Sequence, residues 1–317
     1  MLANLPLICP QCLALDRCEE TLDARLECAR CSTLYPQVEE IPVLMAEAAL
    51  RESLACSELP ADARSAFYHE ATDYLGEPAP PAPEVAAALG FTRGDRLVLE
   101  IGSGRGGFAG LGGDDYCALD YSLTLLRRHL GKYRSICASA EAVPLRKGSC
   151  RFVFTVATLE HVPRADLAFA EINRLLSPGG VAYLAPAWHC RDWMADGLTV
   201  RPYRDLDVMQ KARKLLIPLR NSLLYRGLQQ IPWRLRRRIL AKFAAHPSEL
   251  RFDRLQANYE RYWTSDSDAC SSIDSHEGIL YFETRGYEVL APAGGVAARV
   301  FARGAAIAVR KLGRGDG

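Results

Sequence analysis

Five short apolar runs recur through the middle of the chain, and segments able to form helices separate them. The runs occupy residues 97–101, 116–119, 135–137, 152–156 and 181–185. Strands joined by helices form βαβ units, and consecutive units build a mostly parallel sheet with helices on its faces. Two further runs, 287–290 and 305–309, resume the alternation near the end of the chain. The pattern predicts an α/β fold with a doubly wound sheet.

Four cysteines near the start form two Cys-x-x-Cys pairs. Cys9 and Cys12 make the first pair, Cys28 and Cys31 make the second, and fifteen residues separate the two. Two such pairs can turn four thiolates toward one tetrahedral ion, and the residues between them can form a hairpin. The spacing predicts a structural zinc ribbon held by these four side chains. The alternative is four buried thiols without a metal.

The segment from about residue 5 to residue 45 contains the stretches LICPQC, ECARC and LYPQVEEIPVLM. It resembles the zinc ribbon of the small activator subunit that several tRNA and translation-factor methyltransferases share. That ribbon is also found fused ahead of bacterial methyltransferase domains. The resemblance implies that a methyltransferase domain follows.

The first strand of the middle region runs into a glycine-rich turn. Gly102 and Gly104 begin the pattern GxGxxG, in which glycine lets the backbone approach a ligand closely. More glycines follow and shorten the next helix, whose dipole would anchor a dinucleotide pyrophosphate poorly. Glu100 also places a carboxylate where such a dianion would sit. These features favour a cationic ligand such as S-adenosylmethionine, and Asp120, at the end of the second strand, is placed for its ribose hydroxyls.

The stretch from about 95 to 186 contains VLEIGSGRGGF, ALDYS, SAEAVPLRKGSCRFVFTVATLEHV and EINRLLSPGGVAYLAP. It resembles the class I S-adenosylmethionine-dependent methyltransferases, in the group that methylates small molecules. The resemblance implies a seven-stranded sheet and the following contacts with the cofactor: Gly102 and Gly104 to the methionine moiety, Glu100 to its amino group, Asp120 and Tyr121 to the ribose, Ala140 and Glu141 to the adenine, and Tyr68 as a cap. Ser139 replaces an aspartate common in the family, so the contact with the adenine amino group would rest on a hydroxyl or on backbone.

Two histidines are candidates for removing a proton from the acceptor. A methyltransferase chiefly aligns the nucleophile with the methyl group, and a hydroxyl or ammonium acceptor also needs a base. His161 follows the fourth strand and His189 follows the fifth, where the pocket of a doubly wound sheet opens. We rank His189 slightly ahead of His161, for which a role in shaping the pocket is the main alternative. An acceptor that needs no base, or a base from the later insertion, stays open.

A basic segment interrupts the alternation of strands and helices. Residues 201–242 hold twelve basic and two acidic residues, whereas residues 1–50 have a net charge of −5. Apolar residues recur there at four-residue spacing and predict a basic amphipathic helix: Ile231, Leu235, Ile239 and Phe243. One interpretation is a cap that buries this stripe on the core and points its arginines to water. The others are a membrane-surface patch over 211–243 that presents a lipid-linked substrate, and a clamp for a phosphate-bearing substrate or RNA.

The composition excludes a wholly disordered, collagenous or fibrous chain, since 49% of its residues are hydrophobic and 39 basic residues balance 38 acidic ones. The sequence holds no run of 18 apolar residues, and its start lacks the pattern of a secretory signal. We therefore expect a cytoplasmic protein, peripheral to the inner membrane face if the basic segment binds lipid. The oligomeric state is not predicted.

These patterns predict four parts. They are a zinc ribbon at 1–50, the first part of a methyltransferase core at 51–188, a helical basic insertion at 189–274 and the last strands of the core at 275–317. The predicted function is methyl transfer from S-adenosylmethionine to oxygen or nitrogen of a small-molecule, lipid-linked or saccharide-linked acceptor. The alternatives are an RNA methyltransferase acting on rRNA or tRNA, which the acidic ribbon disfavours, and a cofactor-binding partner subunit without turnover.

Overall fold

The computed structural model describes residues 5–12, 18–20, 25–45, 83–92, 95–128, 132–302 and 304–313. Its contacts divide the chain into two compact units. The first unit is Met1–Thr158, Leu167–Leu184 and Arg310–Gly317, and the second is Leu159–Asp166 and Ala185–Val309. The four-part division drawn from the sequence stays a prediction.

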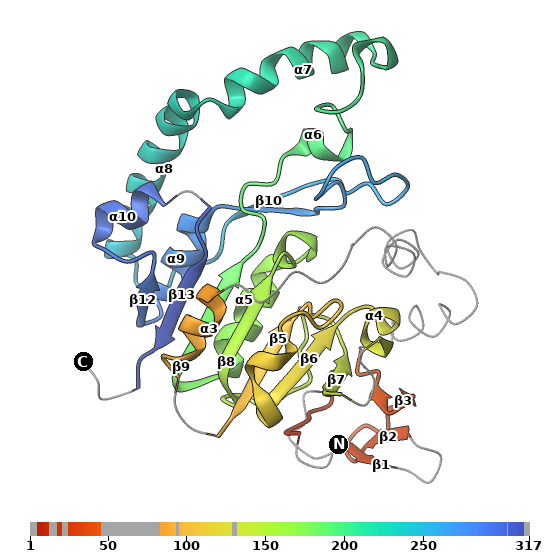
Figure 1. The fold of residues 1–317 in the computed structure, drawn as a ribbon. Helices are drawn as coiled ribbons and strands as arrows, with labels where there is room; N and C mark the ends of the chain where they lie inside the picture. The colour runs from red at the N-terminus through yellow and green to blue at the C-terminus, as the bar shows by residue number, and fades with distance from the viewer. Residues whose placement is uncertain are drawn as a thin grey trace. The chain divides into compact units, whose positions relative to one another are not determined.

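Seven strands form one sheet with the order β12-β13-β9-β8-β5-β6-β7 (Figure 1). Their bounds are Leu97–Ile101 for β5, Tyr116–Asp120 for β6, Arg134–Cys137 for β7, Cys150–Val156 for β8, Leu176–Ala185 for β9, Tyr287–Ala291 for β12 and Ile307–Lys311 for β13. β5 pairs in parallel with both β6 and β8, and β6 pairs in parallel with β7. The predicted α/β fold with a seven-stranded, mostly parallel sheet is confirmed.

The central strands are buried along their whole length. Every residue of β5 and β6 is buried, including the acidic residues Glu100 and Asp120 near their carboxyl ends. Parallel strands covered on both faces favour uninterrupted apolar sequence, which is why these runs stand out. The other elements of this part are the helices α3 Pro83–Leu89, α4 Leu123–Arg127 and α5 Ala165–Leu175, and the 3-10 turns η2 Ala109–Leu111 and η3 Gly113–Asp115. As the glycines predict, these two short turns are the only helical structure between β5 and β6, a segment whose backbone is described throughout.

Four short strands near the start form a separate antiparallel sheet in sequence order. They are β1 Cys18–Glu20, β2 Arg25–Cys28, β3 Leu34–Val38 and β4 Ile41–Pro42. β1 and β2 make a hairpin in which Cys18 lies opposite Cys28. This hairpin is the connection that the spacing of the two cysteine pairs requires.

Backbone hydrogen bonds tie the small sheet to the edge of the large one. Just after β4, Leu44 N donates to Cys137 O of β7 at 2.9 Å. On the amino-terminal side, Ile8 N donates to Pro144 O at 3.0 Å. The segment from Cys137 to Pro144 is therefore held at both ends by residues that flank the small sheet.

The second unit is mainly helical. Its elements are η4 Leu159–His161, α6 Asp192–Ala195, η5 Tyr203–Asp205, α7 Val208–Asn221, α8 Leu223–Phe243, β10 Phe252–Arg254, β11 Ser271–Ile273, α9 Ser275–Glu283 and α10 Val296–Phe301. α8 contacts α7, α9 and α10. Figure 1 shows α7 and α8 following one another along one side of this unit, with α6 below α7 in this view. Among the described helices, none is long and apolar enough to cross a bilayer.

Candidate functional site

The four predicted metal ligands lie together. Cys9 and Cys12 precede β1, Cys28 ends β2, and Cys31 sits in the following turn. The Sγ atoms of Cys9 and Cys31 are 3.7 Å apart, and those of Cys12 and Cys28 are 3.6 Å apart. A tetrahedral zinc ion with bonds of about 2.3 Å to sulfur requires sulfur–sulfur distances of about 3.8 Å. The four thiols therefore fit one zinc ion.

Two hydroxyl groups lie against these sulfur atoms. Tyr35 Oη is 3.1 Å from Cys9 Sγ, and Thr33 Oγ1 is 3.1 Å from Cys31 Sγ. Hydrogen bonds from neighbouring side chains orient metal ligands and disperse the negative charge of thiolates. The surroundings of the cluster thus suit four thiolates that share an ion.

Gly102 and Gly104 adopt backbone conformations that favour glycine, with φ of +75° and +51°. A Cβ atom on Gly102 would lie 2.1 Å from Thr158 Oγ1, so the turn tolerates no side chain there. A Cβ atom on Gly104 would meet none of the described atoms within 4 Å. The turn therefore leaves open space beside the backbone of Gly104, which a ligand could approach closely.

Asp120 ends β6 and is bonded to the same turn. Its Oδ2 accepts a hydrogen bond from Gly104 N at 2.8 Å, and its Oδ1 accepts one from Ser122 N at 2.8 Å. Burial raises the pKa of Asp120, and the backbone N–H groups around it act in the opposite direction. A carboxylate offers about four acceptor positions, so Asp120 keeps capacity for a hydroxyl group of a ligand.

Glu100 is the last residue but one of β5 and accepts a hydrogen bond from the hydroxyl of Tyr116. Burial raises the pKa of Glu100 to about 8, although the hydrogen bond from Tyr116 lowers it. The carboxyl group is therefore largely protonated at neutral pH while no cation lies near it. Sequence reasoning did not identify Tyr116, since nothing in a strand of apolar residues marks its first side chain as a partner of Glu100.

The residues expected near the adenine follow β7. Ser139 Oγ accepts a hydrogen bond from Glu141 N at 3.2 Å, and Ala138 N donates to Asp120 O at 3.0 Å. Ser139, Ala140, Glu141 and the preceding Tyr121 are all partly buried. The structure thus gathers the described cofactor candidates at the carboxyl ends of β5, β6 and β7, and their contacts with a cofactor stay a prediction. Tyr68, the expected cap, lies outside the described residues.

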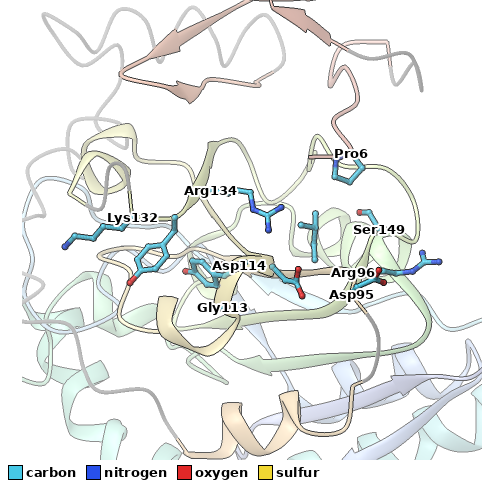
Figure 2. A pocket seen from close by; sticks show the side chains of 12 residues that line it. Pro6, Asp95, Arg96, Gly113, Asp114, Lys132, Arg134 and Ser149 are labelled. Atoms are coloured by element: carbon cyan, nitrogen blue, oxygen red, sulfur yellow. The ribbon is translucent and has the colours of Figure 1, made fainter. Parts of the chain in front are cut away.

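A cavity of about 680 Å³ opens at the opposite ends of these strands (Figure 2). Its lining includes basic side chains such as Arg96 and Arg134 and acidic ones such as Asp95 and Asp114. Figure 2 also shows Pro6, from the segment that leads to the cysteine cluster, at the edge of the cavity. Ligands of doubly wound sheets bind at the carboxyl ends of the strands, so we do not place the cofactor here.

In the second unit, His161 in η4 lies among carboxylates. Its Nδ1 is 3.0 Å from Asp268 Oδ2, and its Nε2 is 3.9 Å from Glu160 Oε1. Burial lowers the pKa of His161, but the hydrogen bond with Asp268 and the neighbouring negative charges outweigh it and raise the pKa to about 9. The ring is therefore held in a fixed orientation and carries a proton at neutral pH.

Glu160 and Asp266 complete the surroundings of His161. One oxygen of Glu160 accepts a hydrogen bond from Ala187 N at 3.0 Å, and the other is buried without a hydrogen-bond partner among the described residues. Burial raises the pKa of both carboxyl groups. Together with Asp268 they form an acidic cluster around one histidine, which can exchange protons or bind a cationic group.

His189 lies in different surroundings. Its Nε2 is 3.4 Å from Arg234 Nη2 and 3.8 Å from Asp274 Oδ1. Burial lowers the pKa of His189 to about 4; Asp274 acts against this shift and the positive charge of Arg234 adds to it. A base flanked by a guanidinium group accepts a proton poorly. The two histidines therefore differ in their surroundings, and which of them is the base stays a prediction.

The sequence contains a local signal near this cluster but none for its geometry. Asp266 and Asp268 belong to a stretch dense in aromatic, hydroxyl and carboxylate side chains, 259–268, which suits the rim of a pocket. The contact between His161 and Asp268 joins residues far apart in the chain, and no local spacing signals such a pair.

Residues 99–184 match the model of a protein family described as a methyltransferase domain. The tRNA (carboxymethyluridine(34)-5-O)-methyltransferase ALKBH8 of Mus musculus is 31% identical over 110 residues, which are 33% of this chain and 16% of that protein. An uncharacterised protein of Methanocaldococcus jannaschii is 39% identical over 87 residues, which are 27% of this chain and 38% of that protein. The chain thus matches less than two fifths of the length of either relative.

Solved structures also resemble the chain. The complex between the Trm112 methyltransferase activator of Haloferax volcanii and a methyltransferase is one of them. The match is 19% identical and covers 44% of this chain and 68% of that one, with a TM-score of 0.35.

Proposed function

Because residues 99–184 match the model of the methyltransferase-domain family, we propose that the chain transfers a methyl group from S-adenosylmethionine to an acceptor. The acceptor atom is oxygen or nitrogen of a small, lipid-linked or saccharide-linked molecule. The cofactor assignment rests on one observation, the hydrogen bond that joins Asp120 to the open turn at Gly104. This site offers a carboxylate and bare backbone, which suit a cation with hydroxyl groups better than a pyrophosphate.

S-adenosylmethionine supplies a methyl group on a positively charged sulfur, ready for in-line displacement. The residues of this chain therefore bind and align more than they activate. Glu100, whose pKa is raised to about 8, would ionise beside an ammonium group, because an opposite charge lowers the pKa of a carboxyl group. The remaining binding roles are those proposed from the sequence: Gly102 and Gly104 for the methionine moiety, Asp120 and Tyr121 for the ribose, and Ser139, Ala140 and Glu141 for the adenine.

We propose that the cluster around His161 takes up the proton that the acceptor loses. The contact of Nδ1 with Asp268 Oδ2, at 3.0 Å, leaves Nε2 as the nitrogen that exchanges a proton. The acidic side chains Glu160 and Asp266 stabilise the imidazolium form after the proton has been taken up. We assign His189 a positioning role instead, because its Nε2 lies 3.4 Å from Arg234 Nη2 and burial keeps its ring neutral.

Binding of the cofactor is tested by titration calorimetry on the purified full chain. Asp120→Ala should lower the affinity for S-adenosylmethionine at least about tenfold, because a hydrogen bond to a charged group contributes about 1.5–3 kcal/mol. NAD should not bind. Asp114→Ala is the matched control, since it removes an exposed acid from the cavity at the other strand ends.

Thermal unfolding of each variant separates loss of binding from loss of fold. If wild type and Asp120→Ala bind S-adenosylmethionine with equal affinity, the ribose does not bind at the end of β6. Loss of affinity in Asp114→Ala alone would move the cofactor to the cavity of Figure 2.

RNA methylation is the second candidate, and the alignment with a tRNA methyltransferase supports it. Transfer from methyl-labelled S-adenosylmethionine to extracted lipids and metabolites, or to total RNA, decides between the two. Label in the lipid or metabolite fraction supports our proposal, and label confined to RNA supports the rival. Absence of label from all fractions, with cofactor binding intact, would favour a partner subunit without turnover.

A further inference from the structure

Arginines line the side of α8 that packs against the rest of the unit. Arg234 is 2% exposed and bonds to both oxygens of Asp274, at 2.7 and 3.0 Å. Arg237 is 8% exposed and bonds to both oxygens of Glu277, at 2.7 and 2.8 Å. Arg238 pairs with Glu283 at 2.7 Å. This side of the helix is therefore attached to α9 and the residue before it by ion pairs.

The apolar stripe of α8 faces the other way. Leu228 is 69% exposed, Ile239 60% and Phe243 80%. These residues are separated by eleven and four positions, so they lie on one side of the helix, opposite the buried arginines. The sequence-based interpretation of a cap with its stripe buried and its arginines in water is therefore inverted for most of this helix.

α7 repeats the arrangement. Its residue Ile217 packs inward against a cluster that contains Trp193 and Leu198. Its exposed apolar residues recur at seven and four positions, on the opposite side: Val208, Leu215 and Leu219. With Leu228, Ile239 and Phe243 they define what we call the apolar face of α7 and α8. Single exposed apolar residues are normal on a protein surface, but several on one side of each of two consecutive helices mark an interaction site.

Positive charge surrounds the apolar face. Residues 208–243 contain ten Lys and Arg and no Asp or Glu. Five of the ten are arginines in ion pairs with acids elsewhere in the unit. Arg236 and Lys242 of α8 are exposed, and together with Lys211 of α7 they form no ion pair with any described residue. Apolar side chains bordered by unpaired cations are the pattern of helices that lie in the interface of an anionic bilayer.

We propose that α7 and α8 bind the surface of an anionic phospholipid bilayer, with the apolar face in the acyl boundary and the unpaired cations at the headgroups. A second copy of the chain fits this surface less well, because two such faces would oppose like charges without an acid on either helix to neutralise them. RNA would leave the apolar side chains without a partner. Membrane binding goes beyond the proposed methyl transfer and does not depend on it.

The test is co-sedimentation of the full chain with vesicles of phosphatidylcholine and phosphatidylglycerol, against vesicles of phosphatidylcholine alone. Wild type should prefer the anionic vesicles. Ile239→Ser with Phe243→Ser should lower partitioning about a hundredfold, since each large apolar side chain moved out of water contributes about tenfold. Val200→Ser with Val296→Ser is the matched control, because both are exposed apolar residues of the same unit outside α7 and α8.

A second pair of variants tests the charge. Arg236→Gln with Lys242→Gln should lower partitioning about thirtyfold at low salt, and the difference should shrink as salt rises. Lys132→Gln with Arg254→Gln, at exposed sites outside these helices, should leave partitioning unchanged.

Three results would overturn the proposal. The first is equal sedimentation of wild type and both α8 double variants. The second is a dimer of the wild type that the serine variants convert to monomer, which would assign the face to a second copy. The third is binding of RNA, and not of vesicles, through the same residues. None of these assays contains the methyl donor, so their failure leaves the proposed methyl transfer standing.

Discussion

Two histidines of the second unit have pKa values that move in opposite directions. The acidic side chains around His161 stabilise its imidazolium form and raise its pKa to about 9. Burial beside Arg234 stabilises neutral His189 and lowers its pKa to about 4. His161 thus contributes stability below pH 6.5 that is lost as the pH rises through about 9. His189 contributes stability above pH 6.5 that is lost as the pH falls through about 4.

If neutral His161 takes the acceptor proton, the rate of methyl transfer should rise with pH until about pH 9. Asp268→Asn should move the midpoint to lower pH, because it removes a hydrogen bond and a charge that raise the pKa of His161. The pH dependence of kcat/KM with labelled donor measures the shift. Asp253→Asn, an exposed acid on β10, should leave the midpoint in place.

His161→Gln should lower kcat by about 10²–10⁴ if the ring is the base. Unchanged activity of this variant, or an unchanged midpoint in Asp268→Asn, would show that the acceptor needs no proton transfer to His161.

At the residue scale, local spacing was sufficient for some groups and not for others. The clustering of Cys9 and Cys12 with the second cysteine pair was predictable, and so were the tight turn at Gly102 and the strand end at Asp120, because each depends on residues close together in the chain. Asp268 was not predictable as the partner of His161, since the two meet only after the chain has folded.

At the element scale, α8 shows which structural features the spacing of apolar residues can predict and which it cannot. The four-residue spacing correctly predicts a helix with an apolar and a basic side, and the structure has that helix at Leu223–Phe243. The spacing does not predict whether the apolar or the basic side of the helix packs inward. That choice depends on Asp274, Glu277 and Glu283, which lie about 40 residues further along the chain and provide acids for the inward arginines.

Neighbouring arginines of α8 should therefore behave differently on substitution. Arg237→Gln should lower the free energy of unfolding by about 3–5 kcal/mol, because it leaves buried Glu277 without its bidentate partner. Arg236→Gln should change it by less than about 0.5 kcal/mol, as expected for an exposed side chain. Urea unfolding followed by circular dichroism measures both values. Equal stability of the two variants would contradict the inverted orientation of α8.

At the scale of the whole molecule, the alternation of strands and helices was enough to predict the large sheet, and the cysteine spacing was enough to predict the small one. How the small sheet attaches was beyond the sequence, since backbone hydrogen bonds to an edge strand require no particular side chain. Leu44 forms a backbone hydrogen bond with Cys137 at the end of β7. Ile8 and Pro6 form backbone hydrogen bonds with residues 144 and 146. The segment between these attachments contains Ser139, Ala140 and Glu141, the residues assigned to the adenine.

This connection predicts that zinc supports cofactor binding from a distance. Zinc contributes roughly 10–16 kcal/mol of apparent binding energy to small ribbons, so its loss should unfold the cysteine cluster and release the segment after β7. Cys28→Ser should lower both the zinc content and the affinity for S-adenosylmethionine, the latter by about tenfold, equivalent to one or two hydrogen bonds. Elemental analysis and titration calorimetry measure the two effects. A chelator should weaken cofactor binding by wild type and leave Cys28→Ser unchanged, which separates zinc loss from other effects of the chelator. Zinc-free protein that binds the cofactor with full affinity would show that the ribbon does not support the adenine segment, and would leave the assignment of Asp120 and Gly104 intact.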